Sequence, residues 1–128
     1  MFFEQALTIP ANTPIEDPAS VVMRVTEGTV QRVWVRWRWG SGNLCGARML
    51  HNTFQYWPLT LGGWFPSSAY PLEFEDYTPI AADSRTIQLE GYNLDDIYPH
   101  TVWVAINIVR DVETRALRQF IQDIQRGS

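Results

Sequence analysis

The sequence predicts an all-β protein, an antiparallel β-sandwich or jelly roll with a short C-terminal helix. Apolar and polar residues alternate in several short runs, turns rich in Gly, Pro and Asn separate these runs, and a helical pattern begins only after residue 110. A chain of 128 residues has the usual size of one domain. We divide it into an N-terminal arm (1–19), a β-sandwich domain (20–109) and a C-terminal helical tail (110–128).

The N-terminal arm begins with residues 1–9, which fit a short strand with Phe3, Leu7 and Ile9 on one face. Residues 10–20 then carry three prolines, which lack a backbone N–H and interrupt a hydrogen-bonded ladder. We therefore expect an extended arm or a connecting loop. Because a proline-rich arm is stiff, it loses little entropy when it lies across a neighbouring subunit.

The β-sandwich domain opens with alternating apolar residues, Val21, Met23 and Val25, the pattern of a half-buried strand. The clearest strand follows at residues 30–39, and Gly28 between the two segments predicts a β-hairpin. Successive side chains of a strand point to opposite faces, so we expect two rows. The inward row contains Val33, Val35, Trp37 and Trp39. The outward row, a candidate partner-binding surface, contains Arg32, Trp34, Arg36 and Arg38.

Shorter strands fill the rest of the domain, and they are expected at residues 44–50, 54–57, 72–77, 86–92 and 101–109. The connection at residues 58–71 combines three prolines with two adjacent glycines and predicts a long surface loop, a kind of loop that is often functional. Its aromatic side chains, together with the residue before it, are Trp57, Trp64, Phe65 and Tyr70. They can pack in the core, fill a pocket of a protein partner or stack on a sugar.

The C-terminal tail changes to a helical period over residues 111–125, with Asp111 as a plausible N-cap. The apolar positions of this helix are Val112, Ala116, Phe120, Ile121 and Ile124. The helix either packs under a loop of its own domain or docks on a neighbour. We expect at least one terminus to contact another subunit, with Phe120, Ile121 and Ile124 as the contact residues of the tail.

Charge and hydropathy exclude some classes of protein. The net charge of −4 and the pI near 5.0 oppose a direct nucleic-acid binder, which usually has a basic stripe. We also expect no membrane attachment, since no apolar run reaches the roughly 18 residues of a membrane span and the start does not resemble a signal peptide. All ten basic residues are arginine, which suits interfaces with carboxylates and aromatic rings better than lysine does.

Catalytic signals are weak, and we assign no catalytic residue, cofactor or metal. His51 and His100 lack the spacing of a metal motif, and Cys45 sits in a strand-like segment where a small buried side chain is the usual role. A weaker alternative is a hydrolase site built from carboxylates. Its members would be Glu73, Glu75, Asp95 and Asp96.

Four segments carry a family resemblance: IPANTPIEDP, LCGARML, QYWPLTLGGWF and YNLDDIYPHTVWV. In this order they resemble segments of small β-rich structural proteins of tailed bacteriophages and their environmental relatives, over residues 8–109. The most specific pieces are residues 9–14 with Asp17-Pro18, and residues 95–101. The arginines and tryptophans of residues 36–39 and the helical tail depart from the family pattern. The resemblance implies a virion component and assigns no catalytic residue.

The expected function is therefore that of a non-enzymatic virion protein, either capsid decoration (cement) or head–tail associated. It would be made in the host cytoplasm and bind other virion proteins, such as the major capsid protein or portal and tail proteins. A homo-oligomer is expected, and a trimer by analogy with decoration proteins. The alternative from a different class is a carbohydrate- or receptor-binding module that uses the aromatic loop.

Overall fold

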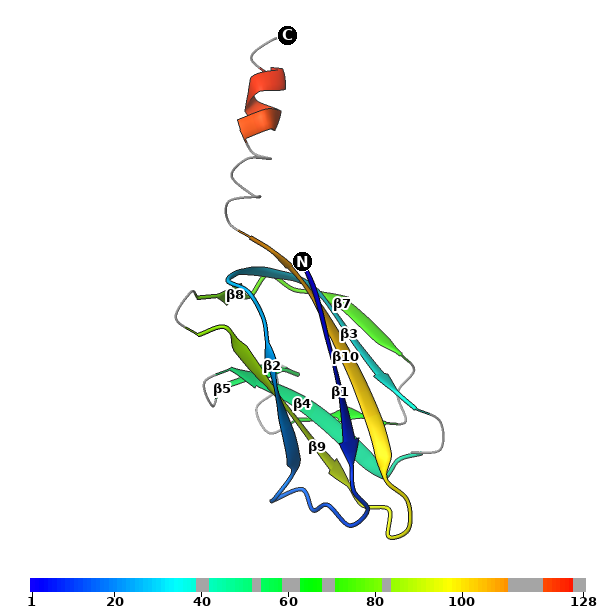
Figure 1. Ribbon diagram of the computed structural model, residues 1–128. Coiled ribbons are helices and arrows are strands. Elements are labelled where there is room, and N and C mark those ends of the chain that lie inside the picture. The colour runs from blue at the N-terminus through cyan, green and yellow to red at the C-terminus, as the bar shows by residue number, and fades with distance from the viewer. Residues whose placement is uncertain are drawn as a thin grey trace.

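The computed structural model describes the chain in seven segments, with the backbone alone at residues 54–56. These segments are residues 1–38, 42–51, 54–58, 63–67, 71–81, 84–110 and 119–125. Within them the chain forms two antiparallel sheets that pack face to face (Figure 1). The predicted all-β sandwich is confirmed.

Each sheet has five strands in the described part of the chain. Sheet A has the order β1 (Phe2–Ile9), β10 (His100–Val109), β3 (Gly28–Trp37) and β7 (Leu72–Glu75), with β8 (Pro79–Ile80) also paired to β3. Sheet B has the order β2 (Ala19–Arg24), β9 (Thr86–Asn93), β4 (Cys45–His51) and β5 (Phe54–Trp57), with β6 (Phe65–Pro66) also paired to β4.

The strand pairs are nested along the sequence. β1 pairs with β10, β2 with β9, β3 with β7, and β4 with β5, all antiparallel. The chain is thus one long hairpin whose two arms are wrapped together into two sheets. This is the jelly-roll arrangement, one of the two folds that the alternating pattern allowed.

The predicted hairpin around Gly28 is wrong. β2 lies in sheet B and β3 in sheet A, so the turn between them carries the chain from one layer to the other. Gly28 has a φ of 141°, and a Cβ atom there would lie 2.5 Å from the carbonyl oxygen of Val109. The glycine is needed for this close approach to β10 and not for a two-residue hairpin turn.

The short strand predicted at residues 1–9 is present as β1, but it is part of the sandwich and not of a separate N-terminal arm. β1 pairs with β10 over its whole length, from Phe2 opposite Asn107 to Ile9 opposite His100. Leu7 and Ile9 lie in the core, and Phe3 packs against it. Because this apolar face completes the core, the sandwich begins at residue 2, and residues 10–18 are the loop between β1 and β2.

The core lies between the sheets and follows the predicted alternation. Val33 and Val35 are buried and Trp37 packs against them, while Trp39 lies outside the described residues. The register of β3 against β10 shifts by one residue between Arg32 and Val30, which leaves Gln31 as a bulge.

The described part of the C-terminal helix spans residues 119–125, and the start of the predicted helix lies outside the described residues. Phe120, Ile121 and Ile124 are all exposed, so the sandwich does not cover them. Docking of these three side chains on a neighbour stays a prediction.

Candidate protein-binding face

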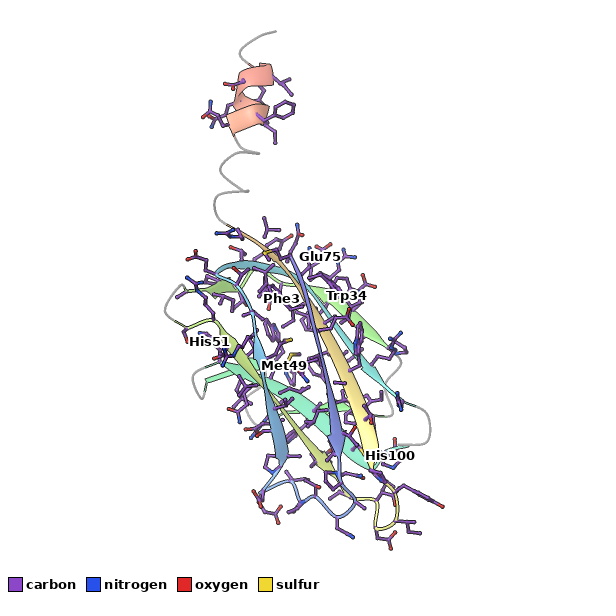
Figure 2. The ribbon with its side chains drawn as sticks, in the orientation of Figure 1. Phe3, Trp34, Met49, His51, Glu75 and His100 are labelled. Carbon is purple, nitrogen blue, oxygen red and sulfur yellow. The ribbon has the colours of Figure 1, made fainter. Side chains whose placement is uncertain are left out.

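The outer face of sheet A carries the predicted partner-binding row. Arg32, Trp34, Arg36 and Arg38 leave β3 and its end on the side away from the core, between Val33, Val35 and Trp37. Figure 2 shows Trp34 and Glu75 near each other on the β3 and β7 side of the sheet.

The strand register arranges this face as rows across the sheet. One row runs from Glu4 through Ala105 and Trp34 to Glu73. The next row towards the chain termini joins Phe2, Asn107, Arg32 and Glu75. The row on the other side joins Ala6, Trp103 and Arg36. Together with Thr8, Thr101 and Arg38, these residues define the outer face of sheet A.

Arg32 lies between two carboxylates. Its Nη1 donates to Glu73 at 2.6 Å and its Nη2 donates to Glu75 at 2.8 Å, which raises the pKa of the guanidinium. All three side chains are well exposed, so the contacts add little to stability. Their effect is to hold the guanidinium in one position and to leave this end of the face with a net negative charge.

Aromatic rings occupy the middle of the face. The Phe2 and Trp34 rings meet edge to face, with centroids 5.4 Å apart. The Arg36 guanidinium lies 4.5 Å from the centroid of the Trp103 ring, and the Trp103 indole donates to Glu4 at 3.0 Å. Partly exposed Trp and Arg are the residue types that dominate binding energy at protein interfaces.

Two hollows on this face are lined by described residues, and they differ in charge. The Glu75 hollow has a volume of about 390 Å³ and is lined by Gln31, Arg32, Trp34, Glu75, Tyr77 and Asn107. The Arg38 hollow has a volume of about 200 Å³ and is lined by Ala6, Arg36, Trp37, Arg38, Thr101 and Trp103. The Arg38 hollow holds two arginines and no carboxylate among these residues, so the face has a basic end and an acidic end.

The predicted aromatic platform is mostly wrong. Trp57 is 1% exposed and Phe65 is 9% exposed, so both belong to the core. Their strands, β5 and β6, pair with β4 and complete sheet B, and a sheet needs apolar side chains on its inner face. Tyr70 lies outside the described residues.

Trp64 is half-buried on the outer face of sheet B. Its ring meets the Tyr92 ring edge to face at 5.0 Å, and the Arg48 guanidinium lies 4.2 Å from its centroid. Arg48 also donates twice to Glu90, at 3.0 and 2.8 Å. These contacts use Trp64 within the chain, so it does not form an open stacking platform.

A buried asparagine that the sequence analysis missed organises the loop end of the sandwich. Asn93 is fully buried; its amide nitrogen donates to the carbonyls of Ile9 at 3.1 Å and Tyr98 at 2.9 Å. Its side-chain oxygen accepts from the Asp95 amide at 3.0 Å and from the Cys45 thiol at 3.3 Å. A lone asparagine in a strand carries no sequence signal of such a role.

Asp95 and His100 complete this loop end. The Asp95 carboxylate accepts from the backbone amides of Ile97 and Tyr98 at 2.9 and 3.3 Å and contacts His100 Nε2 at 2.8 Å. These contacts lower the pKa of the Asp95 carboxyl group, and the hydrogen bond from the Ile97 amide has the largest effect. Burial raises the pKa of the Cys45 thiol to about 11, which favours the protonated thiol at neutral pH.

Three of the four segments that carry the family resemblance meet at one end of the molecule, where the β1–β2 and β9–β10 loops lie (Figure 1). The backbones of Thr13 and Asn93 exchange two hydrogen bonds of 2.9 Å, and the Asn12 amide donates to the Asp95 carbonyl at 2.8 Å. The Leu94 amide donates to the Leu44 carbonyl at 2.9 Å. The loops so joined expose large apolar side chains, which we call the loop-end patch. Its members are Ile15, Leu44, Leu94, Ile97 and Tyr98.

The carboxylates of the alternative hydrolase site do not come together. Glu73 and Glu75 lie on the outer face of sheet A and contact Arg32, whereas Asp95 lies in the β9–β10 loop and contacts His100. A hydrolase site built from these four carboxylates needs them around one bond, and they lie in two separate places, so that prediction is wrong.

The described residues contain no group of three or more His, Cys, Asp or Glu side chains placed to hold a metal ion. Among the same residues, no helix has the length and hydropathy to cross a membrane. Comparison of the chain with models of known protein families gives no match, and comparison with curated proteins gives none either.

Proposed function

We propose that this protein is a non-enzymatic structural component of a tailed-bacteriophage virion that binds neighbouring virion proteins through the outer face of sheet A. The observation that carries the proposal is the ordered row of arginine and tryptophan on that face. Contacts within the chain hold its side chains in place while leaving them partly exposed. Such preorganisation lowers the entropic cost of binding.

Two further observations support a virion role. The segments IPANTPIEDP and YNLDDIYPHTVWV resemble those of phage structural proteins, and in this chain they build the loop end. The jelly roll is also an architecture of viral capsid proteins, which is an argument from analogy. The partners proposed are the major capsid protein or the portal and tail proteins, and the location is the virion.

The loop-end patch supplies a second contact surface. Its apolar side chains are exposed on loops that the Asn93 and Asp95 contacts hold rigid. Exposed apolar side chains that gather in one place mark interaction sites. A lattice protein that touches more than one neighbour needs two such surfaces.

The experiment is mass spectrometry of purified particles, followed by a test of incorporation. We expect the protein in particles at a fixed copy number, and we expect Arg36→Glu to reduce its incorporation strongly. Arg24→Glu is the matched control, because Arg24 is an exposed arginine on the outer face of sheet B. Absence from washed particles, or equal incorporation of the two variants, would contradict the proposal.

A further inference from the structure

Charge is distributed unevenly over the outer face of sheet A. At the end near the chain termini, Glu73 and Glu75 lie on either side of Arg32, and this group has a net negative charge. Glu4 lies nearer the middle of the face, where it accepts from the Trp103 indole. At the loop end, the Arg38 hollow holds Arg36 and Arg38 without a carboxylate in its lining. The two ends therefore have opposite net charges, and the aromatic rings lie between them.

Such a face is complementary to itself. If two copies meet face to face with the strands of one running opposite to the strands of the other, each basic end lies on the acidic end of its partner. A twofold axis produces this arrangement, because it makes the same patch serve on both subunits. The axis would pass near Trp34 and Trp103, between the two charged ends.

The acidic end retains hydrogen-bonding capacity for a partner. Arg32 contacts Oε1 of Glu73 and Oε1 of Glu75, and these two contacts do not use the Oε2 atoms. A guanidinium of a second copy can bind there through charge-assisted hydrogen bonds. Arg36 is already held over the Trp103 ring, so little side-chain entropy is lost when it binds.

The area of the face suits a dimer. Three strands of about eight residues and the four residues of β7, at about 4.8 Å spacing and 3.3 Å per residue, give a flat footprint of about 440 Å². The accessible area exceeds this footprint because side chains project from the sheet, so the face is close to the roughly 600 Å² per partner at the lower end of specific interfaces.

We propose that the outer face of sheet A binds a second copy of this chain across a twofold axis, with the basic end of each copy on the acidic end of the other. The inference rests on the proposed function, since it uses the same face and names one of its partners. It replaces the trimer expected by analogy with a dimer.

The test is the mass of the full-length chain in solution by light scattering and sedimentation, at concentrations up to about 100 μM. We expect twice the chain mass of 14.8 kDa. The dissociation constant should rise with ionic strength between about 0.05 and 0.5 M salt, because screening weakens exposed charge pairs. A monomer or a trimer over this range, or a dimer insensitive to salt, would overturn the proposal.

Two charge-reversal variants test the geometry. Arg36→Glu with Arg38→Glu gives both ends of the face a net negative charge, and Glu73→Lys with Glu75→Lys gives both ends a net positive charge. Each variant alone should dimerise about 100-fold more weakly, because like charges then oppose each other. An equimolar mixture of the two should recover a heterodimer, since the charges at positions 36 and 38 of each copy are again opposite to those at positions 73 and 75 of the other. Failure of the mixture to associate, with both variants folded by thermal unfolding, would overturn the twofold contact.

Arg24→Glu serves as the control that must leave the wild-type dimer intact. If the basic variant does not fold, the acidic variant and the salt dependence still decide the question. A monomeric wild type whose Arg36→Glu variant fails to enter particles would overturn the dimer and leave the proposed function standing. A salt-sensitive dimer whose disruption leaves incorporation into particles unchanged would support the dimer and contradict the proposed function of this face.

Discussion

The two outer faces of the sandwich use the same pair of residue types for different purposes. On sheet A, the Arg36 guanidinium lies 4.5 Å from the Trp103 ring. On sheet B, the Arg48 guanidinium lies 4.2 Å from the Trp64 ring. The two distances are therefore similar, and the difference lies in what surrounds each pair.

On sheet B the pair is covered and its charge is balanced. Glu90 accepts two hydrogen bonds from Arg48, and the two side chains are only 13% and 23% exposed. Trp64 packs on Tyr92, whose ring lies over Gly46 where a Cβ atom would collide with it. On sheet A, Arg36 is exposed and lines an open hollow. A stacked arginine thus stabilises the fold where it is covered and offers a contact where it is open.

The largest loss of unfolding free energy is expected at Asn93, whose side chain connects the two sheets. Asn93 ends β9 of sheet B and donates to the Ile9 carbonyl at the end of β1 in sheet A. Asn93→Ala leaves two carbonyls, an amide and the Cys45 thiol without this partner, and we expect a loss of about 3 kcal/mol or more in unfolding free energy. Denaturant unfolding measures the loss, and thiol labelling of the buried Cys45 should become faster.

Asn107→Ala is the control for this prediction. Asn107 lies on the outer face of sheet A and donates to Gln31 in an exposed contact at 2.9 Å. Its removal should cost less than about 1 kcal/mol. Equal losses of unfolding free energy for the two variants would show that the buried hydrogen bonds of Asn93 contribute no more to stability than one exposed hydrogen bond.

The second prediction separates the two stacked arginines by their charge partners. Arg48→Ala leaves Glu90 largely buried without its cation, and we expect a loss of about 2 kcal/mol, below the value for a fully buried pair because some solvent reaches it. Replacing both residues, Arg48→Met with Glu90→Met, should recover most of the lost stability. A single-variant loss below about 0.5 kcal/mol, typical of an exposed pair, would contradict the covered state of sheet B.

Gly46→Ala tests whether the Tyr92 ring packs directly on the outer face of sheet B. A Cβ atom at this position would lie 2.5 Å from the Tyr92 ring, so Gly46→Ala must displace Tyr92 and with it Trp64. We expect a loss of about 1 to 2 kcal/mol from overpacking. In a double-mutant cycle with Tyr92→Ala, the cost of Gly46→Ala should fall, because the ring that it meets is gone. Additive losses would show that the ring does not cover the glycine.

The contrast between local and distant information explains which features the sequence predicted. Alternation identifies the two sides of a strand, so the inward Val33 and Val35 and the outward Trp34 follow directly from the sequence. It does not identify the sheet to which a strand belongs. The jelly roll pairs the first strand with the last, and such distant pairings leave no trace in neighbouring residues, which is why the Gly28 turn was assigned to a hairpin.

The candidate site was predictable to a similar extent. The outward arginine and tryptophan row depends on one strand and was found, whereas the opposing Glu73 and Glu75 depend on the pairing of β3 with β7. Phe65 was assigned to a surface loop, and Trp57 was grouped with its aromatic side chains, because Pro and Gly interrupt the segment that follows Trp57. Their burial follows only from the position of β5 and β6 beside β4.

A fall in pH should weaken the contacts of the Asp95 carboxylate at the loop end of the sandwich. The pKa of Asp95 is lower in the folded protein than in the unfolded chain, so its contacts stabilise the fold above the usual carboxyl pKa of about 3.9 and lose this effect as the pH falls through the lowered value. The melting temperature of wild type should therefore approach that of Asp95→Asn between about pH 5 and pH 2. A constant difference over this range would remove Asp95 from the acid response.

The smallest effect on stability is expected for Arg36→Ala, and this variant tests the open state of sheet A most directly. An exposed cation over an aromatic ring contributes about 0.5 to 1 kcal/mol, and Trp103 keeps its hydrogen bond to Glu4 when the guanidinium is removed. We therefore expect an unfolding free energy within about 1 kcal/mol of wild type, together with weaker self-association, since the lost group is one that faces the partner.

Arg48→Ala should show the opposite pattern, with a larger loss of stability and unchanged association of the molecules that remain folded. Unfolding followed at several protein concentrations separates the two contributions, because only a dimer gains stability as concentration rises. If Arg36→Ala lowered the stability of the dilute monomer as much as Arg48→Ala does, the two faces would be equivalent, and the open face would have to be reinterpreted as part of the folded scaffold.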